Sequence, residues 1–190
     1  MDIIIKHAAV LTMDDACPVL LDAFVGIDEG KISYLSTCEP RISARREIDA
    51  RGKLLMPGLI NAHTHVPMTL MRGYADDYDL HTWLFDHVFP VEAKLDARCI
   101  KTGALLGMME QIRSGTTSIS DMYFQIPVIA EAAAQAGIKA NLSNGATFFG
   151  APEAYCFETD SVTAEMREML ERWHGYDNGR IRLDAAVHAE

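Results

Sequence analysis

The stretch Met56-Pro57-Gly58-Leu59-Ile60-Asn61-Ala62-His63-Thr64-His65 decides the fold. Its apolar run after Pro57-Gly58 predicts a strand, and strand residues two apart point to the same side. His63 and His65 therefore converge at the carboxyl end of this strand, where parallel α/β sheets and barrels carry their active sites. Imidazole suits zinc, iron or nickel, so the pair predicts half of a mononuclear metal site. Incidental surface or packing histidines are the alternative for a bare His-x-His pair.

After this stretch, apolar strand-like runs alternate with helical segments, which is typical of βα units around a parallel sheet. We expect strands at residues 55–62, 116–121, 139–144 and 181–187. We expect helices at residues 96–114, 128–136 and 162–173. Gly115 and Gly137 are expected to end the first two helices in the left-handed conformation. The segment 66–93 is too long for a simple βα connection and is expected to form a lid or a substrate wall.

Residues 1–56 have a different pattern, of short β-type runs separated by turn residues. We expect strands at residues 2–6, 8–13, 23–28, 31–35 and 46–48. Glu29-Gly30 predicts a tight hairpin. The chain is therefore expected to consist of a small β module at 1–56 and an α/β region at 57–190.

The composition bounds the function. The 27 acidic and 17 basic residues give a net charge of −10, and 49% of the 190 residues are hydrophobic. This balance indicates a globular protein with no membrane span and disfavours a nucleic-acid surface, which needs clustered Lys and Arg. The start of the chain has no signal-peptide pattern, so we expect a cytoplasmic protein. The four cysteines have no metal-site spacing and are expected to be buried thiols.

The run from Met56 to His65 resembles the signature of the amidohydrolase superfamily of metal-dependent hydrolases. The continuation, with Met68-Thr69-Leu70-Met71-Arg72-Gly73, Ala75-Asp76-Asp77 and Pro90-Val91-Glu92, is similar to the branch of 5′-methylthioadenosine and S-adenosylhomocysteine deaminases and triazine chlorohydrolases. This resemblance implies the first four strands of a (β/α)8 barrel, preceded by part of a small β-sandwich. Such a barrel takes about 250 residues, so we expect the chain to be the amino-terminal half of a longer enzyme.

The activity that the resemblance implies is metal-dependent hydrolysis of a C–N bond, most simply deamination of adenosine, 5′-methylthioadenosine or S-adenosylhomocysteine. The alternatives are hydrolysis of a triazine or another N-heterocycle, and a non-catalytic half barrel. One divalent ion is implied, zinc before iron, with His63 and His65 as two of its ligands. The catalytic glutamate, histidine and aspartate of the family are expected beyond residue 190, so the isolated chain is expected to be inactive. The full-length protein is expected to be a homo-oligomer that binds a small-molecule substrate.

The resemblance also implies residues for substrate binding. Glu92 is expected to bind the ribose hydroxyls, although a carboxylate near a helix N-terminus is the simpler alternative. Trp83 is expected to line an apolar wall, with a core position as the alternative. His188 is expected to contact the substrate, and a third metal ligand or a buried structural histidine are the alternatives.

Two further positions bear on whether the substrate carries a carboxylate. Asn144 occupies the position of an arginine that often contacts the substrate in this branch, which weakens the case for a carboxylate-bearing substrate. Arg72 is expected to fix a loop rather than to meet a substrate carboxylate. His81 and His87, in the expected lid, are assigned no role.

Overall fold

The computed structural model describes residues 1–145 and 150–186. The chain divides into two compact units, Met1–Pro57 and Gly58–Glu190. The sequence placed this boundary between Met56 and Pro57. Each unit has a hydrophobic core of its own.

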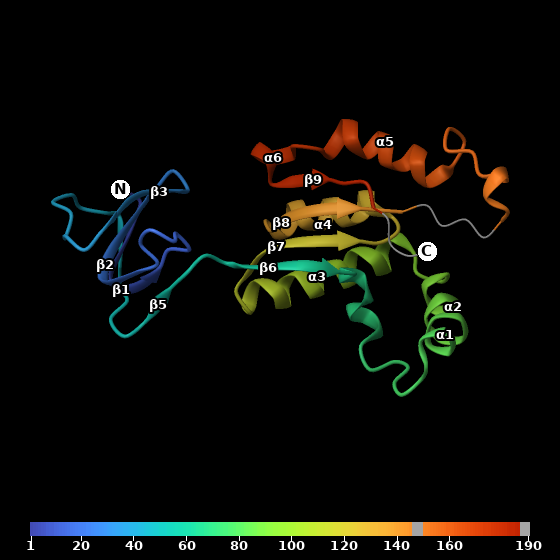
Figure 1. The fold of residues 1–190 in the computed structure, drawn as a ribbon, viewed down its shortest axis with the longest axis horizontal. Coiled ribbons are helices and arrows are strands. Elements are labelled where there is room, and N and C mark those ends of the chain that lie inside the picture. The colour runs from blue at the N-terminus through green and yellow to red at the C-terminus, as the bar shows by residue number, and fades with distance from the viewer. Residues whose placement is uncertain (146–149, 187–190) are drawn as a thin grey trace. The chain divides into compact units, whose positions relative to one another are not determined.

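The first unit is a β-sheet with the strand order β3-β2-β1-β4, in which β5 also pairs with β1 (Figure 1). The strands are β1 (Ile3–Leu11), β2 (Val19–Asp28), β3 (Lys31–Ser36), β4 (Arg46–Asp49) and β5 (Leu54–Leu55). The hairpin between β2 and β3 is confirmed, because Glu29 and Gly30 both have positive φ, as a tight two-residue turn requires. Strand β5 was not predicted.

The two strands expected at residues 2–6 and 8–13 are one strand. His7 has a φ of +62° and the register with β2 shifts between Ile5 and Ala8, so β1 contains a bulge where the sequence suggested a break. An extra residue in one strand of an antiparallel pair bends the strand without ending it. The apolar residues on both sides of the bulge thus remain in one sheet.

The second unit contains a four-stranded parallel sheet in the order β6-β7-β8-β9 (Figure 1). The strands are β6 (Leu59–Thr64), β7 (Thr116–Met122), β8 (Lys139–Ser143) and β9 (Ile181–Leu183). All four predicted strands are present, although β9 is shorter than expected. Strand β6 lies at one edge of the sheet, so its apolar residues Leu59 and Ile60 are exposed, by 51% and 73%.

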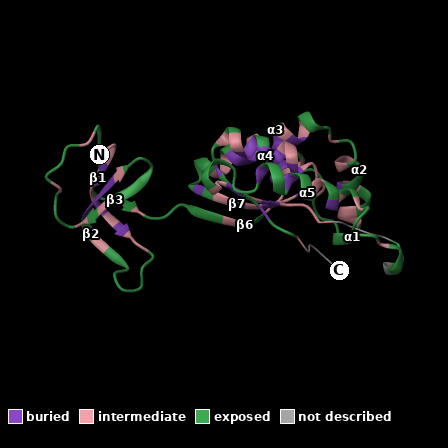
Figure 2. Ribbon diagram, turned by 90° about the horizontal axis from the view of Figure 1, so that it is seen from above, coloured by how far each residue is buried: buried purple, intermediate pink, exposed green. Residues whose placement is uncertain are grey.

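Helices α3 and α4 lie along one face of this sheet, where buried residues gather (Figure 2). The long helices are α3 (Ala97–Arg113), α4 (Ile126–Ala136) and α5 (Ser161–Trp173), and the short ones are α6 (Tyr176–Gly179) and η3 (Pro152–Ala154). Asp96 caps α3 by accepting the N–H of Cys99. Gly115 and Gly137 have positive φ after α3 and α4, as predicted. No helix in the described part of the chain has the length and hydropathy of a membrane span.

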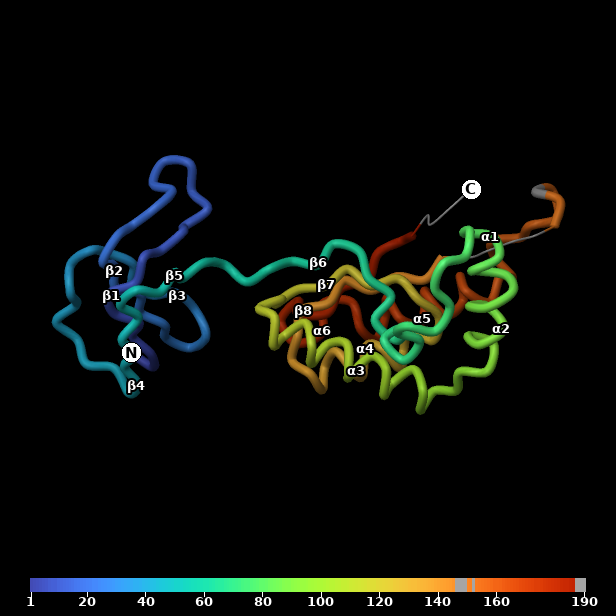
Figure 3. Tube along the Cα trace, turned by 90° about the horizontal axis from the view of Figure 1, so that it is seen from below, coloured from blue at the N-terminus to red at the C-terminus, as the bar shows by residue number. Residues whose placement is uncertain are grey.

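The connection from β6 to α3 is folded rather than a simple loop, and it lies at the carboxyl end of the sheet (Figure 3). It contains the 3-10 helix η1 (Val66–Met71), the helix α1 (Leu80–Thr82), the π-helical turn η2 (Trp83–Val88) and the helix α2 (Phe89–Glu92). Within η2 the N–H of Phe89 donates to the carbonyl of Leu84, five residues back. The following Pro90 has no N–H, so it cannot continue the ordinary helical pattern at this point.

The helix η1 packs closely on α3. A Cβ atom added to Gly103 would lie 2.6 Å from the carbonyl oxygen of Pro67, and one added to Gly107 would lie 2.6 Å from Oγ1 of Thr69. The guanidinium of Arg72 forms an ion pair with Glu110 of α3. Arg72 thus contacts the helix behind the loop, in agreement with the predicted loop-fixing role, which stays a prediction. Both glycines give η1 room to approach the helix behind it.

The prediction of buried thiols is wrong for three of the four cysteines. Cys17, Cys38 and Cys156 are exposed, and Cys99 is partly exposed. All four lie in turns or near helix ends rather than on the apolar faces that form the two cores.

Replacing Gly103 by alanine should destabilise the second unit, because the new methyl group meets backbone that cannot move away. We expect the G103A variant to lose about 1–3 kcal/mol in free energy of unfolding, although alanine favours helices over glycine. Thermal or urea unfolding measures this difference. The matched control T102A, at an exposed position of the same helix, should be neutral or slightly stabilising, and equal stability of G103A and the wild type would contradict the close packing.

Candidate metal and substrate site

His63 and His65 lie side by side at the carboxyl end of β6. Their ring centroids are 5.0 Å apart and the ring planes are nearly perpendicular, at 83°. His63 is exposed and His65 is half-buried. The two imidazole rings at the end of this strand thus lie close together, as expected for residues two apart.

The ring of His65 is held by the neighbouring strand. Its Nδ1 lies 2.5 Å from the carbonyl oxygen of Met122, the last residue of β7. Because a carbonyl only accepts hydrogen bonds, Nδ1 carries the proton and the neutral ring has its lone pair on Nε2. Histidines that ligate metals characteristically donate the other ring N–H to a carbonyl or carboxylate in this way. The donor chemistry and tautomer of His65 therefore fit a divalent metal ion.

Asp121, next to Met122, is buried at the same end of β7. Its side chain is 1% exposed, and Oδ1 accepts the backbone N–H of Val66 at 2.7 Å. Burial raises the pKa of the Asp121 carboxyl to about 7, against the opposing effect of the Val66 hydrogen bond. The turn that follows His65 is thus tied to β7.

Glu92 and Tyr123 form a second polar pair at this end of the sheet. The hydroxyl of Tyr123 donates to Oε1 of Glu92 at 2.5 Å, across a separation of 31 residues. Burial and the Glu92 carboxylate raise the pKa of the Tyr123 phenol well above its usual range, so the phenol remains a donor. The Tyr123 ring centroid lies 6.3 Å from that of His65. Through Tyr123, Glu92 is connected to the neighbourhood of the histidines.

Trp83 lines a cavity of about 250 Å³ rather than the main core. The walls come from the segment between β6 and α3, and Met68 connects the cavity to the histidines because its N–H donates to the carbonyl of His65 at 2.9 Å. The lining residues are Met68, Met71, Gly73, Tyr74, Ala75, Asp76, Trp83 and Val88. The cavity is thus lined by both apolar and polar atoms and contains one carboxylate, that of Asp76.

Of the two remaining predicted residues, the structure describes only Asn144. Asn144 follows β8, and its side-chain amide donates to Oε2 of Glu165, a residue of α5, at 3.1 Å. His188 lies outside the described residues. No group of three or more His, Cys, Asp or Glu side chains in residues 1–145 and 150–186 is arranged to hold a metal ion.

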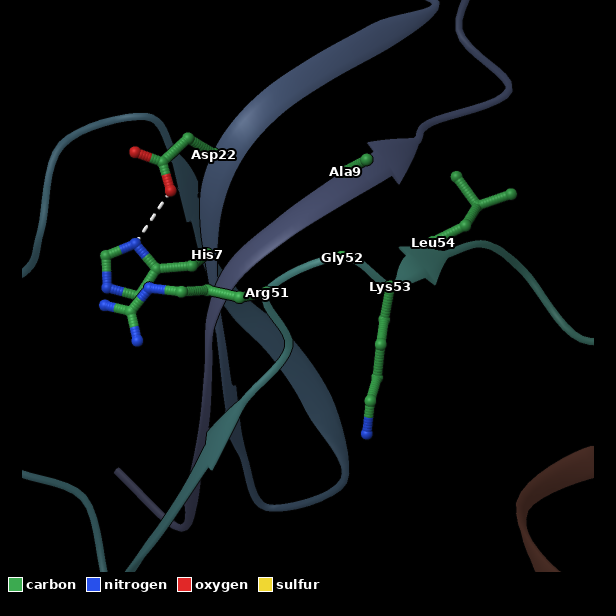
Figure 4. A pocket seen from close by; sticks show the side chains of 7 residues that line it. All are labelled: His7, Ala9, Asp22, Arg51, Gly52, Lys53 and Leu54. Atoms are coloured by element: carbon green, nitrogen blue, oxygen red, sulfur yellow. Dashed lines mark hydrogen bonds and ion pairs between the residues drawn. The ribbon is translucent and has the colours of Figure 1, made fainter.

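A second, shallower pocket lies in the first unit and contains none of the predicted residues (Figure 4). At one end, Nδ1 of His7 lies 2.7 Å from Oδ1 of Asp22, and both residues have positive φ at the bulge. Lys53 points away from this pair (Figure 4). The lining residues are His7, Ala9, Asp22, Arg51, Gly52, Lys53 and Leu54. Of its charged groups, His7 and Asp22 are thus paired with each other.

The sequence assigned no role to Asp121, Met122 or Tyr123. Residues 119, 121 and 123 share one face of β7 because strand side chains alternate, and Ile119, Asp121 and Tyr123 are all buried. An aspartate on the apolar face of a strand is a visible signal in the sequence. The role of the Met122 carbonyl has no such signal, because every residue has one.

Solved structures with the same fold carry metals. An adenosine deaminase from Xanthomonas campestris with bound zinc matches with a TM-score of 0.83 and 32% identity. The match covers 97% of this chain and 42% of the deaminase chain. The atrazine chlorohydrolase TrzN from Arthrobacter aurescens, complexed with zinc, matches with a TM-score of 0.82 and 25% identity. The match covers 96% of this chain and 46% of the chlorohydrolase chain. The four-stranded sheet is therefore part of a barrel, as predicted.

Curated relatives match the chain over almost all of its length. A 5-methylthioadenosine/S-adenosylhomocysteine deaminase of Acetivibrio thermocellus is 41% identical over 192 residues, which is 100% of this chain and 43% of that protein. A 5′-deoxyadenosine deaminase of Methanosarcina mazei is 42% identical over 99% of this chain and 42% of that protein. The chain thus spans less than half the length of these relatives. The family model described as amidohydrolase family matches residues 54–189, and the chain belongs to the amidohydrolase family.

Proposed function

We propose that the protein is a metal-dependent deaminase of adenosine derivatives, to which this chain contributes two metal ligands and part of the substrate pocket. The observation that carries the proposal is the pair His63 and His65, with the tautomer of His65 fixed by the Met122 carbonyl. Zinc is the ion we favour, since two similar proteins were crystallised with it. When bound, such an ion supplies Lewis-acid activation of water for attack on an electron-poor ring carbon.

The other residues of the chain bind and orient the substrate in this proposal. Glu92, held by the Tyr123 hydroxyl, accepts hydrogen bonds from two neighbouring ribose hydroxyls. The cavity beside Trp83 takes the 5′ substituent of the nucleoside and excludes water from it. Relatives at about 41% identity named as deaminases of 5-methylthioadenosine, S-adenosylhomocysteine and 5′-deoxyadenosine support this substrate class.

Charge favours a substrate without a carboxylate. The Trp83 cavity contains Asp76, and the amide of Asn144 donates to Glu165 where the branch often has an arginine. A negatively charged substrate arm would lack a cationic partner at both positions. Removing such an unpaired charge from water costs several kcal/mol, as for other buried ions. We therefore place 5′-methylthioadenosine and 5′-deoxyadenosine ahead of S-adenosylhomocysteine.

Ammonia release tests the proposed reaction. The protein expressed from the gene that contains these 190 residues should release ammonia from 5′-methylthioadenosine and 5′-deoxyadenosine, and more slowly from S-adenosylhomocysteine. A coupled ammonia assay measures the three rates. Chloride release from a chlorinated triazine, without ammonia release from any nucleoside, would instead favour the alternative activity, hydrolysis of a triazine.

Replacing either histidine should weaken zinc binding. We expect the variants H63A and H65A each to lose at least about tenfold in zinc affinity. Removing a group that only orients a metal ligand already costs about tenfold or more in affinity, and removing the ligand itself should cost at least as much. Competition with a chelating dye measures the affinity, and elemental analysis measures the bound zinc. The variant H81A, which removes a histidine from α1, is the matched control. Wild-type zinc binding in both H63A and H65A would contradict the metal site.

The variant E92Q should impair recognition of ribose. Losing a charge-assisted hydrogen bond of about 1.5–3 kcal/mol corresponds to a loss of roughly 10- to 100-fold in kcat/KM for a nucleoside. Steady-state kinetics with adenosine and 2′-deoxyadenosine measure this loss, which should be smaller for the deoxy substrate. E131Q, at a glutamate that pairs with Lys101 on the helical layer, is the control. Equal losses for both nucleosides would argue against contact with the 2′-hydroxyl.

A further inference from the structure

Asp121 is a costly residue at its position. It is the only buried carboxylate in residues 1–145 and 150–186, and its Oδ2 atom accepts no hydrogen bond from a described residue. A buried polar group without full compensation destabilises a fold. The other carboxylate oxygen, Oδ1, accepts a backbone N–H, which an apolar side chain could not do.

The oxygen that is used holds the start of η1. The first N–H groups of a helix have no partner within the helix, and the side chain of His65 at the N-cap position makes no capping hydrogen bond. Asp121 satisfies the N–H of Val66 from another strand, across a separation of 55 residues. Val66 is itself 2% exposed, so water cannot replace this acceptor.

The two hydrogen bonds from β7 act on consecutive residues of one turn. Asp121 holds the backbone of Val66, and the carbonyl of Met122 holds the imidazole of His65. The backbone of His65 also accepts the N–H of Met68 in η1. If the Val66 bond is lost, the turn can rotate relative to β7 and the distance from His65 to the Met122 carbonyl is no longer fixed.

We propose that Asp121 is a positioning residue, whose bond to the Val66 N–H sets the orientation and tautomer of His65 for metal binding. The proposal rests on the proposed metal role of His65. It gives a role to the oxygen acceptor on the apolar face of β7. An oxygen acceptor at this position is the requirement, so an amide should serve almost as well as a carboxylate and an apolar side chain should not.

The test compares D121L, D121N and the control I119V, which removes a methyl group from a buried residue of the same strand. Two quantities are measured on the protein expressed from the gene that contains these 190 residues: the His65 tautomer, from long-range ¹H–¹⁵N spectra, and the zinc affinity, by competition with a chelating dye. We expect D121L to lose the single Nδ1–H tautomer and about tenfold or more in zinc affinity. D121N and I119V should retain both properties, and thermal unfolding checks that each variant is folded.

Two results would overturn the proposal. One is a folded D121L variant with the wild-type tautomer and zinc affinity. The other is an equal loss in I119V, which would assign the effect to packing of the strand. Zinc binding that does not depend on His65 would instead contradict the proposed function. In that case the tautomer of His65, measured in the absence of metal, would still test the role of the Val66 hydrogen bond.

Discussion

The site depends on the hydrogen bonds between the end of β7 and the turn after β6. A parallel sheet brings the carboxyl ends of its strands to one edge, but it does not fix the chain beyond the last ladder bond. Asp121 and Met122 extend the contact by one residue pair, to Val66 and the ring of His65. The close approach of η1 to Gly103 and Gly107 of α3 then holds the same turn from behind.

The main elements of this arrangement could be predicted because their signals are local. Periodicity gives the strands and helices of the second unit, Asp96 and Gly115 mark the two ends of α3, and Glu29-Gly30 marks a hairpin. The spacing of His63 and His65 is also local, and it predicts that the two side chains lie on the same side of the strand. These features depend on residues fewer than about five positions apart, where the geometry of the chain decides the outcome.

The features that could not be predicted depend on distant contacts. Glu92 meets Tyr123 across 31 residues, and Val66 meets Asp121 across 55. The bulge at His7 reads locally as the end of a strand, and only the pairing with β2 shows that the strand continues. The segment between β6 and α3 has no apolar periodicity because its turns are short and one is π-helical. Its structure follows from Asp79, Pro90 and the packing on α3 rather than from a repeat.

The pairing of two imidazoles with a fixed tautomer also limits what this part of the fold can do alone. A closed zinc centre uses four ligands, and a catalytic one uses three from the protein. In the proposed site His63 and His65 provide two, and the described residues contain no group of three or more side chains arranged to hold a metal ion. A site of this kind must take its remaining ligands from outside the described residues. Under the proposed function, β6 and β7 hold two ligands in advance, so that little conformational freedom is lost when the others meet the same ion.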